Sequence, residues 1–211
     1  MNKTARLETF SDGVFAIAAT LLILEVKLPG HGSVAHDLVH AWPSYVAYAI
    51  SFLTIGIIWV NHHTVMEQID RVDRTFLFIN VIFLMTVAFS PFPTRIVAEH
   101  LREGSKSAAF AYGLTFTMMA ISYGVMWFYA AMGRRLIAED ADQRVVSGIS
   151  RSFAPGSLIY GAATLSSLLS AYVAVALYAA IALFYVLESS IFGRDEVSDP
   201  LVPGTGGSRA S

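Results

Sequence analysis

Apolar stretches long enough to cross a lipid bilayer recur along this chain of 211 residues. A membrane-spanning helix needs about 20 residues, and the sequence offers such stretches at residues 8–28, 42–66, 75–97 and 107–132, with a longer one at 153–190. Only 14% of the residues are charged and 55% are hydrophobic, and the mean hydropathy is +0.57. Because an ordinary globular domain has about 25% charged residues, the sequence predicts an all-α integral membrane protein.

The stretch 153–190 is too long for one membrane span. We divide it near residues 169–171 into two spans joined by a tight hairpin, which brings the total to six. Residues 1–193 are thus expected to form a single six-helix transmembrane domain, and residues 194–211 a polar C-terminal tail. The end of that tail, LVPGTGGSRAS, resembles an expression linker or the remnant of a protease site. The absence of a clear internal repeat weighs mildly against an inverted-repeat transporter.

The placement of lysine and arginine indicates how the spans are oriented. With the N-terminus inside, nine of these residues lie in inside segments and four in outside loops, if Arg209 in the tail is left aside. The inside set is Lys3, Arg6, Arg71, Arg74, Arg134, Arg135, Arg144, Arg151 and Arg194, and the outside set is Lys27, Arg95, Arg102 and Lys106. This asymmetry predicts a multi-pass protein with both termini in the cytoplasm.

The sequence gives little support to an enzyme, a metal site or a nucleic-acid partner. A net charge of −2 does not suggest nucleic-acid binding, and a chain without cysteine has neither disulfides nor thiolate metal sites. The neighbours His62 and His63 point about 100° apart on a helix, so they do not share a metal easily. Ser11 and Asp12 lie outside any G-x-S-x-G turn, so a hydrolase triad is not indicated. We expect no enzyme activity, no cofactor and no bound metal.

An aspartate lies in the first apolar stretch, RLETFSDGVFAIAATLLILE, residues 6–25. A charge at the centre of a bilayer costs about 2.5–3.5 kcal/mol on insertion scales and is retained with a partner, a water-filled cavity or a function. At about 100° per residue, Ile17, Leu21 and Leu24 share one stripe of the helix. Asp12 lies about 140° away from Ile17 on the same helical wheel. Taken alone, an apolar stripe of this kind most often packs in a core.

Other polar residues are expected at the depth of Asp12. The first span enters from the inside, the second returns there and the third starts there, so Ser11, Asp12, either His62 or His63, and Asn80 fall in one slab of the membrane. Hydrogen bonds from histidine and asparagine would stabilise a buried carboxylate, because an unpaired buried charge is costly. The cluster is either a structural clamp on the first span, a cation site, a proton-linked switch or part of a gate.

Three further features leave alternatives open. Trp59 lies about one turn from the histidine pair, either as an interface anchor or packed against the first span. Pro91 and Pro93 are expected to end the third span, the alternative being a kink. Glu25 and Asp37 near the outer mouth either concentrate cations or are ordinary helix-end charges.

The pattern R-x-x-x-F-S-D-G-V-F-A-I-A-x-T-L-L-x-L-E, which runs from Arg6 through Phe10, Ser11 and Asp12 to Glu25, is specific. It resembles the first span of the transmembrane protein 175 family of potassium channels, and in particular the bacterial members with one six-helix unit per chain. The segments I-W-x-x-H-H, residues 58–63, and P-F-P-T, residues 91–94, fit the same family. The resemblance extends over the six-span layout, but its specificity lies almost entirely in the first span.

The resemblance implies a homotetramer in a bacterial inner membrane, with four copies of the first helix lining a pore for K⁺ and other monovalent cations and no separate filter loop. Ile17, Leu21 and Leu24 would then form an apolar constriction, which blocks ions by dewetting when it is narrow. Thr20, beside them, would assist ion passage or selectivity. The implied structural and gating network comprises Arg6, Phe10, Ser11, Asp12, Trp59, His62, His63 and Asn80.

Two other functions remain compatible with the residues alone. One is a proton-coupled secondary transporter that uses Asp12 and a histidine as its protonation site. The other is a membrane scaffold without transport activity, in which the polar cluster is purely structural.

Overall fold

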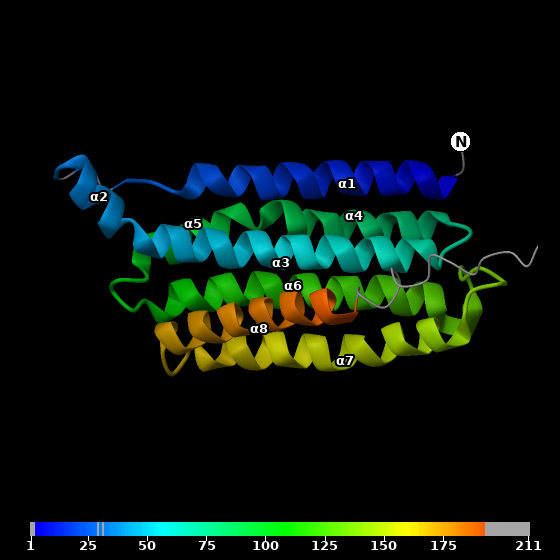
Figure 1. Ribbon diagram of the computed structural model, residues 1–211. Helices are drawn as coiled ribbons and strands as arrows, with labels where there is room; N and C mark the ends of the chain where they lie inside the picture. The colour runs from blue at the N-terminus through cyan, green and yellow to red at the C-terminus, as the bar shows by residue number, and fades with distance from the viewer. Residues whose placement is uncertain (1–2, 29, 31, 193–211) are drawn as a thin grey trace, which may run out of the picture.

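The computed structural model describes residues 3–28, 30 and 32–192, and these residues form an elongated bundle of helices (Figure 1). Its elements are α1 (Lys3–Leu21), η1 (Leu22–Glu25), α2 (Val34–His40), α3 (Trp42–Glu67), α4 (Arg74–Phe89), α5 (Pro91–His100), α6 (Lys106–Ala131), η2 (Met132–Arg134), α7 (Gln143–Ser166) and α8 (Ala171–Phe192). The predicted all-α architecture is therefore confirmed for the described part of the chain. The predicted tail, residues 194–211, and Arg194 lie outside the described residues.

The helices form three layers. The helix α1 packs against α3 and α4, α6 packs against α4, α5 and α7, and α8 completes the far side against α3 and α7. Figure 1 shows the start of α1, the α3–α4 connection and the start of α7 at one end of the bundle, and α2 with the α7–α8 hairpin at the other. The helix α1 is thus an outer element that contacts the bundle through one side.

Four segments in the described part of the chain are long and apolar enough to cross a membrane: Thr4–Glu25, Trp42–Glu67, Arg74–His100 and Lys106–Arg134. The segment Ala171–Leu187 is a shorter apolar helix. The helix α7 lies alongside these spans, but its first turns are polar. The total of six spans therefore stays a prediction.

The structure corrects two boundaries. Pro91 and Pro93 do not end the third span, because α5 continues to His100 after a break at Ser90. A proline is tolerated in the first turn of a helix, where its missing N–H has no intrahelical partner. The helix α7 begins at Gln143, ten residues before the apolar stretch that predicted it, and Asp142 caps its first turn.

Hydrogen bonds and close contacts stabilise the interior of the bundle. The Ser51 hydroxyl lies 2.8 Å from Thr94 Oγ1 and 2.9 Å from Tyr112 Oη, which joins α3, α5 and α6. Tyr178 Oη lies 2.6 Å from Thr164 Oγ1, which joins α7 and α8 beside α6. Close packing and polar contacts of this kind hold helices together where lipid removes the hydrophobic drive between them.

Because Gly113 on α6 has no side chain, the side chains of Thr164 and Tyr178 can pack directly against it. A Cβ at Gly113 would overlap the Tyr178 hydroxyl and lie 2.8 Å from Thr164 Oγ1. We expect Gly113→Ala to lower the stability of the bundle by about 1–3 kcal/mol through overpacking, measured by thermal unfolding in detergent. The matched control is Gly161→Ala, where a Cβ meets nothing within 4 Å. Equal stability of the two variants would contradict this packing.

Asp73 ties the start of α4 to the connection between α6 and α7. Its Oδ1 accepts a hydrogen bond from the Phe76 N–H at 2.8 Å, and its Oδ2 accepts one from Tyr129 Oη at 2.8 Å and lies 3.2 Å from Arg135 Nη2. The hydrogen bond from Phe76 first, with Tyr129 and Arg135, holds the pKa of Asp73 below its ordinary value.

A lowered pKa makes Asp73 stabilising above the pKa it has in the unfolded chain, and this contribution is lost as the pH falls through its folded value. We expect Asp73→Asn, which keeps a helix-capping side chain, to lower the melting temperature by a constant amount near neutral pH. The difference from the unchanged protein should shrink as the pH falls below the ordinary value of 3.8. A difference that does not change with pH would show that the charge contributes nothing.

Candidate functional site

The candidate site is built on α1, whose inner side is buried in the bundle. Ser11, Phe15, Ala18 and Leu22 are all buried, and they recur every three or four residues. This spacing places them on one face of a helix. Phe15 lies at the centre of that face, with its ring centroid 5.5 Å from the His62 ring and 5.9 Å from the Phe83 ring.

A buried chain of hydrogen bonds joins α1 to α3 and α4. Asn80 Nδ2 donates to Ser11 Oγ at 3.2 Å, and Ser11 Oγ donates to the Leu7 carbonyl at 2.9 Å. The Asn80 Oδ1 accepts from His62 Nε2 at 3.2 Å, which places the ring proton on Nε2. Ser11, His62 and Asn80 are all buried. We call these three residues the polar clamp.

Asp12 lies outside the polar clamp. Its side chain is exposed, and its Oδ1 accepts a hydrogen bond from Trp59 Nε1 at 2.9 Å. Neither histidine donates to it in the described structure, and His63 Nε2 lies 3.6 Å from Glu67 Oε1. The predicted histidine or asparagine partner of Asp12 is therefore wrong. The bond from Trp59 agrees with the alternative in which this residue lies against the first span, although its side chain is exposed. Arg6 and Phe10 are exposed.

The opposite side of α1 and η1 is apolar and largely exposed. Ile17 is 61% exposed and Leu24 is 65% exposed, and Leu21 is exposed between them. Thr20 is exposed on the same side, and its Oγ1 donates to the Ile17 carbonyl at 2.9 Å, so its hydroxyl hydrogen is used within the helix. We call this side, with Ile17, Thr20, Leu21 and Leu24, the bare face.

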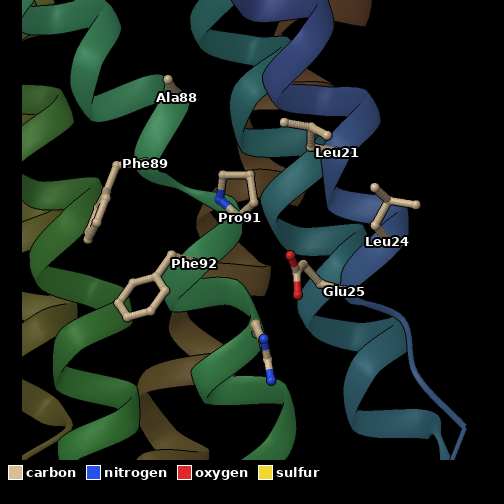
Figure 2. A pocket seen from close by; sticks show the side chains of 8 residues that line it. Leu21, Leu24, Glu25, Ala88, Phe89, Pro91 and Phe92 are labelled. Atoms are coloured by element: carbon tan, nitrogen blue, oxygen red, sulfur yellow. The ribbon is translucent and has the colours of Figure 1, made fainter.

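A cavity of about 290 Å³ lies beside the Leu24 end of the bare face, next to the break between α4 and α5. It is lined by Leu21, Leu24, Glu25, Ala88, Phe89, Pro91, Phe92 and Arg95. Figure 2 shows the Glu25 carboxylate turned toward Pro91, whereas Leu24 points away from that helix break. Two residues of the predicted constriction therefore border unfilled space in the single chain.

Comparison with known proteins identifies the family. Residues 6–91 match the family described as endosomal/lysosomal potassium channel TMEM175. A protein of Streptomyces collinus described as a potassium channel is 43% identical over 190 residues, which cover 88% of this chain and 92% of that protein. One of Chamaesiphon minutus, also described as a potassium channel, is 38% identical over 195 residues, 90% of this chain and 96% of that protein. This chain belongs to the TMEM175 family.

The fold agrees with this assignment. A crystal structure of a lysosomal potassium-selective channel TMEM175 homolog from Chamaesiphon minutus matches with a TM-score of 0.81 and 36% identity, covering 89% of this chain and 98% of that one. A TMEM175 protein of Gallus gallus, described as an endosomal/lysosomal proton channel, is 35% identical over 105 residues, only 21% of its length. Membership of the family and the apolar helices identify a multi-pass membrane protein.

Phe15 is the part of this site that sequence analysis missed. It lies four residues after Ser11 and on the same face of the helix. The helical period could therefore have predicted that Phe15 is buried together with Ser11. The partner of Asp12 could not be predicted in this way. The rotation of α3 about its own axis decides whether Trp59 or a histidine faces Asp12, and the sequence does not show that rotation.

The polar clamp makes a prediction about stability. Removing the Asn80 amide leaves Ser11 and His62 with unsatisfied buried groups, so we expect Asn80→Ala to destabilise the chain by about 1–3 kcal/mol. The measurement is thermal unfolding in detergent, with Asn61→Ala, a change at an exposed position on α3, as the matched control. A melting temperature equal to that of the control would show that the clamp does not hold α1.

Proposed function

We propose that this protein is a potassium-permeable cation channel, formed by four copies of the chain with α1 of each lining the pore. The observation that carries the proposal is the bare face, which exposes Ile17, Leu21 and Leu24 on the side of α1 opposite to its buried face. The relatives described as potassium channels point to the same activity. A helix clamped on one side and apolar on the other is suited to line a closed axis.

Four copies of the bare face would form a ring that controls ions without binding them tightly. A narrow apolar ring holds no continuous water, so an ion meets a dehydration barrier, and a wider ring lets hydrated ions pass. The sequence contains no TVGYG-like filter. Selectivity for K⁺ over Na⁺ then rests on the lower cost of dehydrating the larger ion, with Thr20 as the polar group next to the ring. We expect this selectivity to be modest.

The orientation of the channel follows from the basic residues. Arg71, Arg134 and Arg135 lie at the bundle end that carries the start of α1, and Lys27 and Arg102 lie at the other end. The excess of basic residues at the first end supports an orientation with that end in the cytoplasm of a bacterial cell. Both chain termini are then cytoplasmic, and η1 and α2 lie at the outer mouth in the inner membrane.

The proton-coupled carrier receives less support. It needs Asp12 to exchange protons with a nearby histidine, but the Asp12 carboxylate accepts its hydrogen bond from the Trp59 indole. An indole N–H has no second proton position to relay. Contacts of Asp12 thus favour a role in holding α1.

The proposal is tested first by ion flux into liposomes that contain the purified full chain. A channel predicts passive K⁺ flux that exceeds Na⁺ flux in the presence of a proton ionophore, because no coupled ion is needed. Flux that requires an imposed proton gradient would overturn the channel in favour of a carrier. Native mass spectrometry of the same preparation should show a tetramer, and a monomer that conducts would contradict the shared pore.

The pore assignment is tested by Ile17→Asn. A ring of polar side chains keeps water in the constriction, so we expect K⁺ flux to rise roughly tenfold, a barrier change of about 1.4 kcal/mol. The matched control is Leu183→Asn, which places the same change at an exposed apolar position on α8. If both variants leave the flux unchanged, α1 does not line the pore.

A further inference from the structure

A second and larger cavity, of about 690 Å³, lies between α3, α6, α7 and α8 on a side of the bundle away from the bare face. Its volume is within the range of about 300–1,000 Å³ that is usual for small-molecule sites. Phe52, Trp59 and Val60 line it and are exposed, so the cavity opens on the outer surface of the bundle. This opening lies along the span Trp42–Glu67, at the depth of the membrane.

Tyr123, which lines the cavity, has a buried hydroxyl without a hydrogen-bond partner among the described residues. Tyr123 is only 7% exposed, and its hydroxyl makes no hydrogen bond to any residue that the structure describes. Its ring is held by Phe83, with centroids 5.1 Å apart, and by Phe153 at 4.8 Å. Because an unsatisfied buried hydroxyl is costly and rare, this hydroxyl indicates a ligand that supplies a hydrogen-bond acceptor.

The remaining lining describes the ligand more closely. None of the described lining residues is charged, so the bound part of the ligand is neutral. The lining is mainly apolar, and its polar side chains are distributed along the whole cavity: Asn61, Thr64, Ser152, Ser157, Tyr160 and Tyr185. An ester-linked acyl chain fits such a lining, because the chain is mostly apolar and its ester oxygens accept hydrogen bonds.

We propose that this cavity binds one acyl chain of an ester-linked membrane glycerolipid, with an ester carbonyl accepting the hydrogen bond of the Tyr123 hydroxyl. The lipid enters sideways from the bilayer through the opening at Phe52, Trp59 and Val60. In the proposed orientation Tyr123 lies toward the cytoplasmic end of α6, so this is a lipid of the cytoplasmic leaflet.

The lipid would contact residues that hold the pore helix. Trp59 lines the cavity and donates to Asp12 on α1. Tyr123 has its ring 6.4 Å from the ring of His62 in the polar clamp. A lipid bound in the cavity therefore influences the position of α1. Its effect on ion flow rests on the proposed channel function, whereas lipid binding itself does not.

Binding is tested on the full chain in nanodiscs that contain a phosphatidylglycerol with a diazirine in one ester-linked acyl chain. Photolabelling followed by peptide mapping should place labels on α3 and α7 around the cavity. Gly56 lines the cavity and a Cβ there meets nothing within 4 Å, so Gly56→Leu fills it and should lose these labels. The matched control Gly161→Leu, on α7 outside the lining, should keep them.

The hydrogen bond is tested by Tyr123→Phe, which removes the hydroxyl and keeps the ring. We expect labelling by the ester lipid to require a roughly threefold to tenfold higher lipid concentration, the equivalent of one net hydrogen bond. An ether-linked lipid with the same diazirine should label the unchanged protein and Tyr123→Phe alike, because it has no carbonyl to accept the bond. An equal loss with both lipids would overturn the assigned contact.

Two results would overturn the lipid site. One is labelling of the cavity residues that Gly56→Leu leaves unchanged. The other is cross-linking of a cysteine placed at Val60 to a second copy of the chain, which would show that a neighbouring subunit covers the cavity. Failure of the channel proposal is separate, because labelling requires no ion flux. If labelling follows these expectations and K⁺ flux is absent, the lipid site is supported and only its proposed influence on a pore is overturned.

Discussion

The structure depends on the way α1 meets its polar requirements inside a membrane. A buried chain of hydrogen bonds joins Ser11, Asn80 and His62, and the Asp12 carboxylate accepts a hydrogen bond from the Trp59 indole. Both sets of bonds leave α1 from the sides away from the bare face, so that face needs no polar partner. In hydrocarbon, where an unpaired polar group is expensive, this arrangement fixes the rotation of α1 about its own axis more firmly than apolar packing would.

Because the rotation of α1 is fixed, the direction in which the bare face points is fixed as well. Ile17 and Leu24 would be ordinary lipid-facing residues on a helix that could turn, and many apolar residues of this bundle are exposed in that way. Held by the polar clamp, they point in one direction, beside a cavity at Leu21 and Leu24 that the single chain leaves unfilled. On the proposed function, assembly of four copies around α1 would give these residues partners, and the symmetry of a closed ring would supply a pore without any added loop.

The sequence predicted what depends on hydropathy and helical period. The spans at α3 and α6 agree with their predicted positions within one residue at each end, because their apolar stretches stop where the helices stop. The first turns of α7 were missed because Gln143–Ser152 is helical but polar. The predicted third span, residues 75–97, included the helix after Ser90, but hydropathy did not show that Pro91 starts a new helix and does not end the span. On α1, the helical period correctly predicted that Ser11 and Ile17 lie on different faces of the helix. The choice of Trp59 over His63 as the neighbour of Asp12 depends on how α3 is turned, which only tertiary packing decides.

The position of the polar clamp also restricts how such a pore could open. Rotation of α1 would move Ile17 away from an axis only by breaking the hydrogen bond between Ser11 and Asn80 deep in the bundle. A tilt about the clamp keeps that bond: Leu24 lies thirteen residues beyond Ser11, about 20 Å along the helix, so a tilt of about 10° moves it by about 3 Å. The outer end is also where α1 changes to the looser helix η1 and borders open space. On the proposed function, the ring at Leu21 and Leu24 therefore widens by tilting, with the polar clamp as the fixed point.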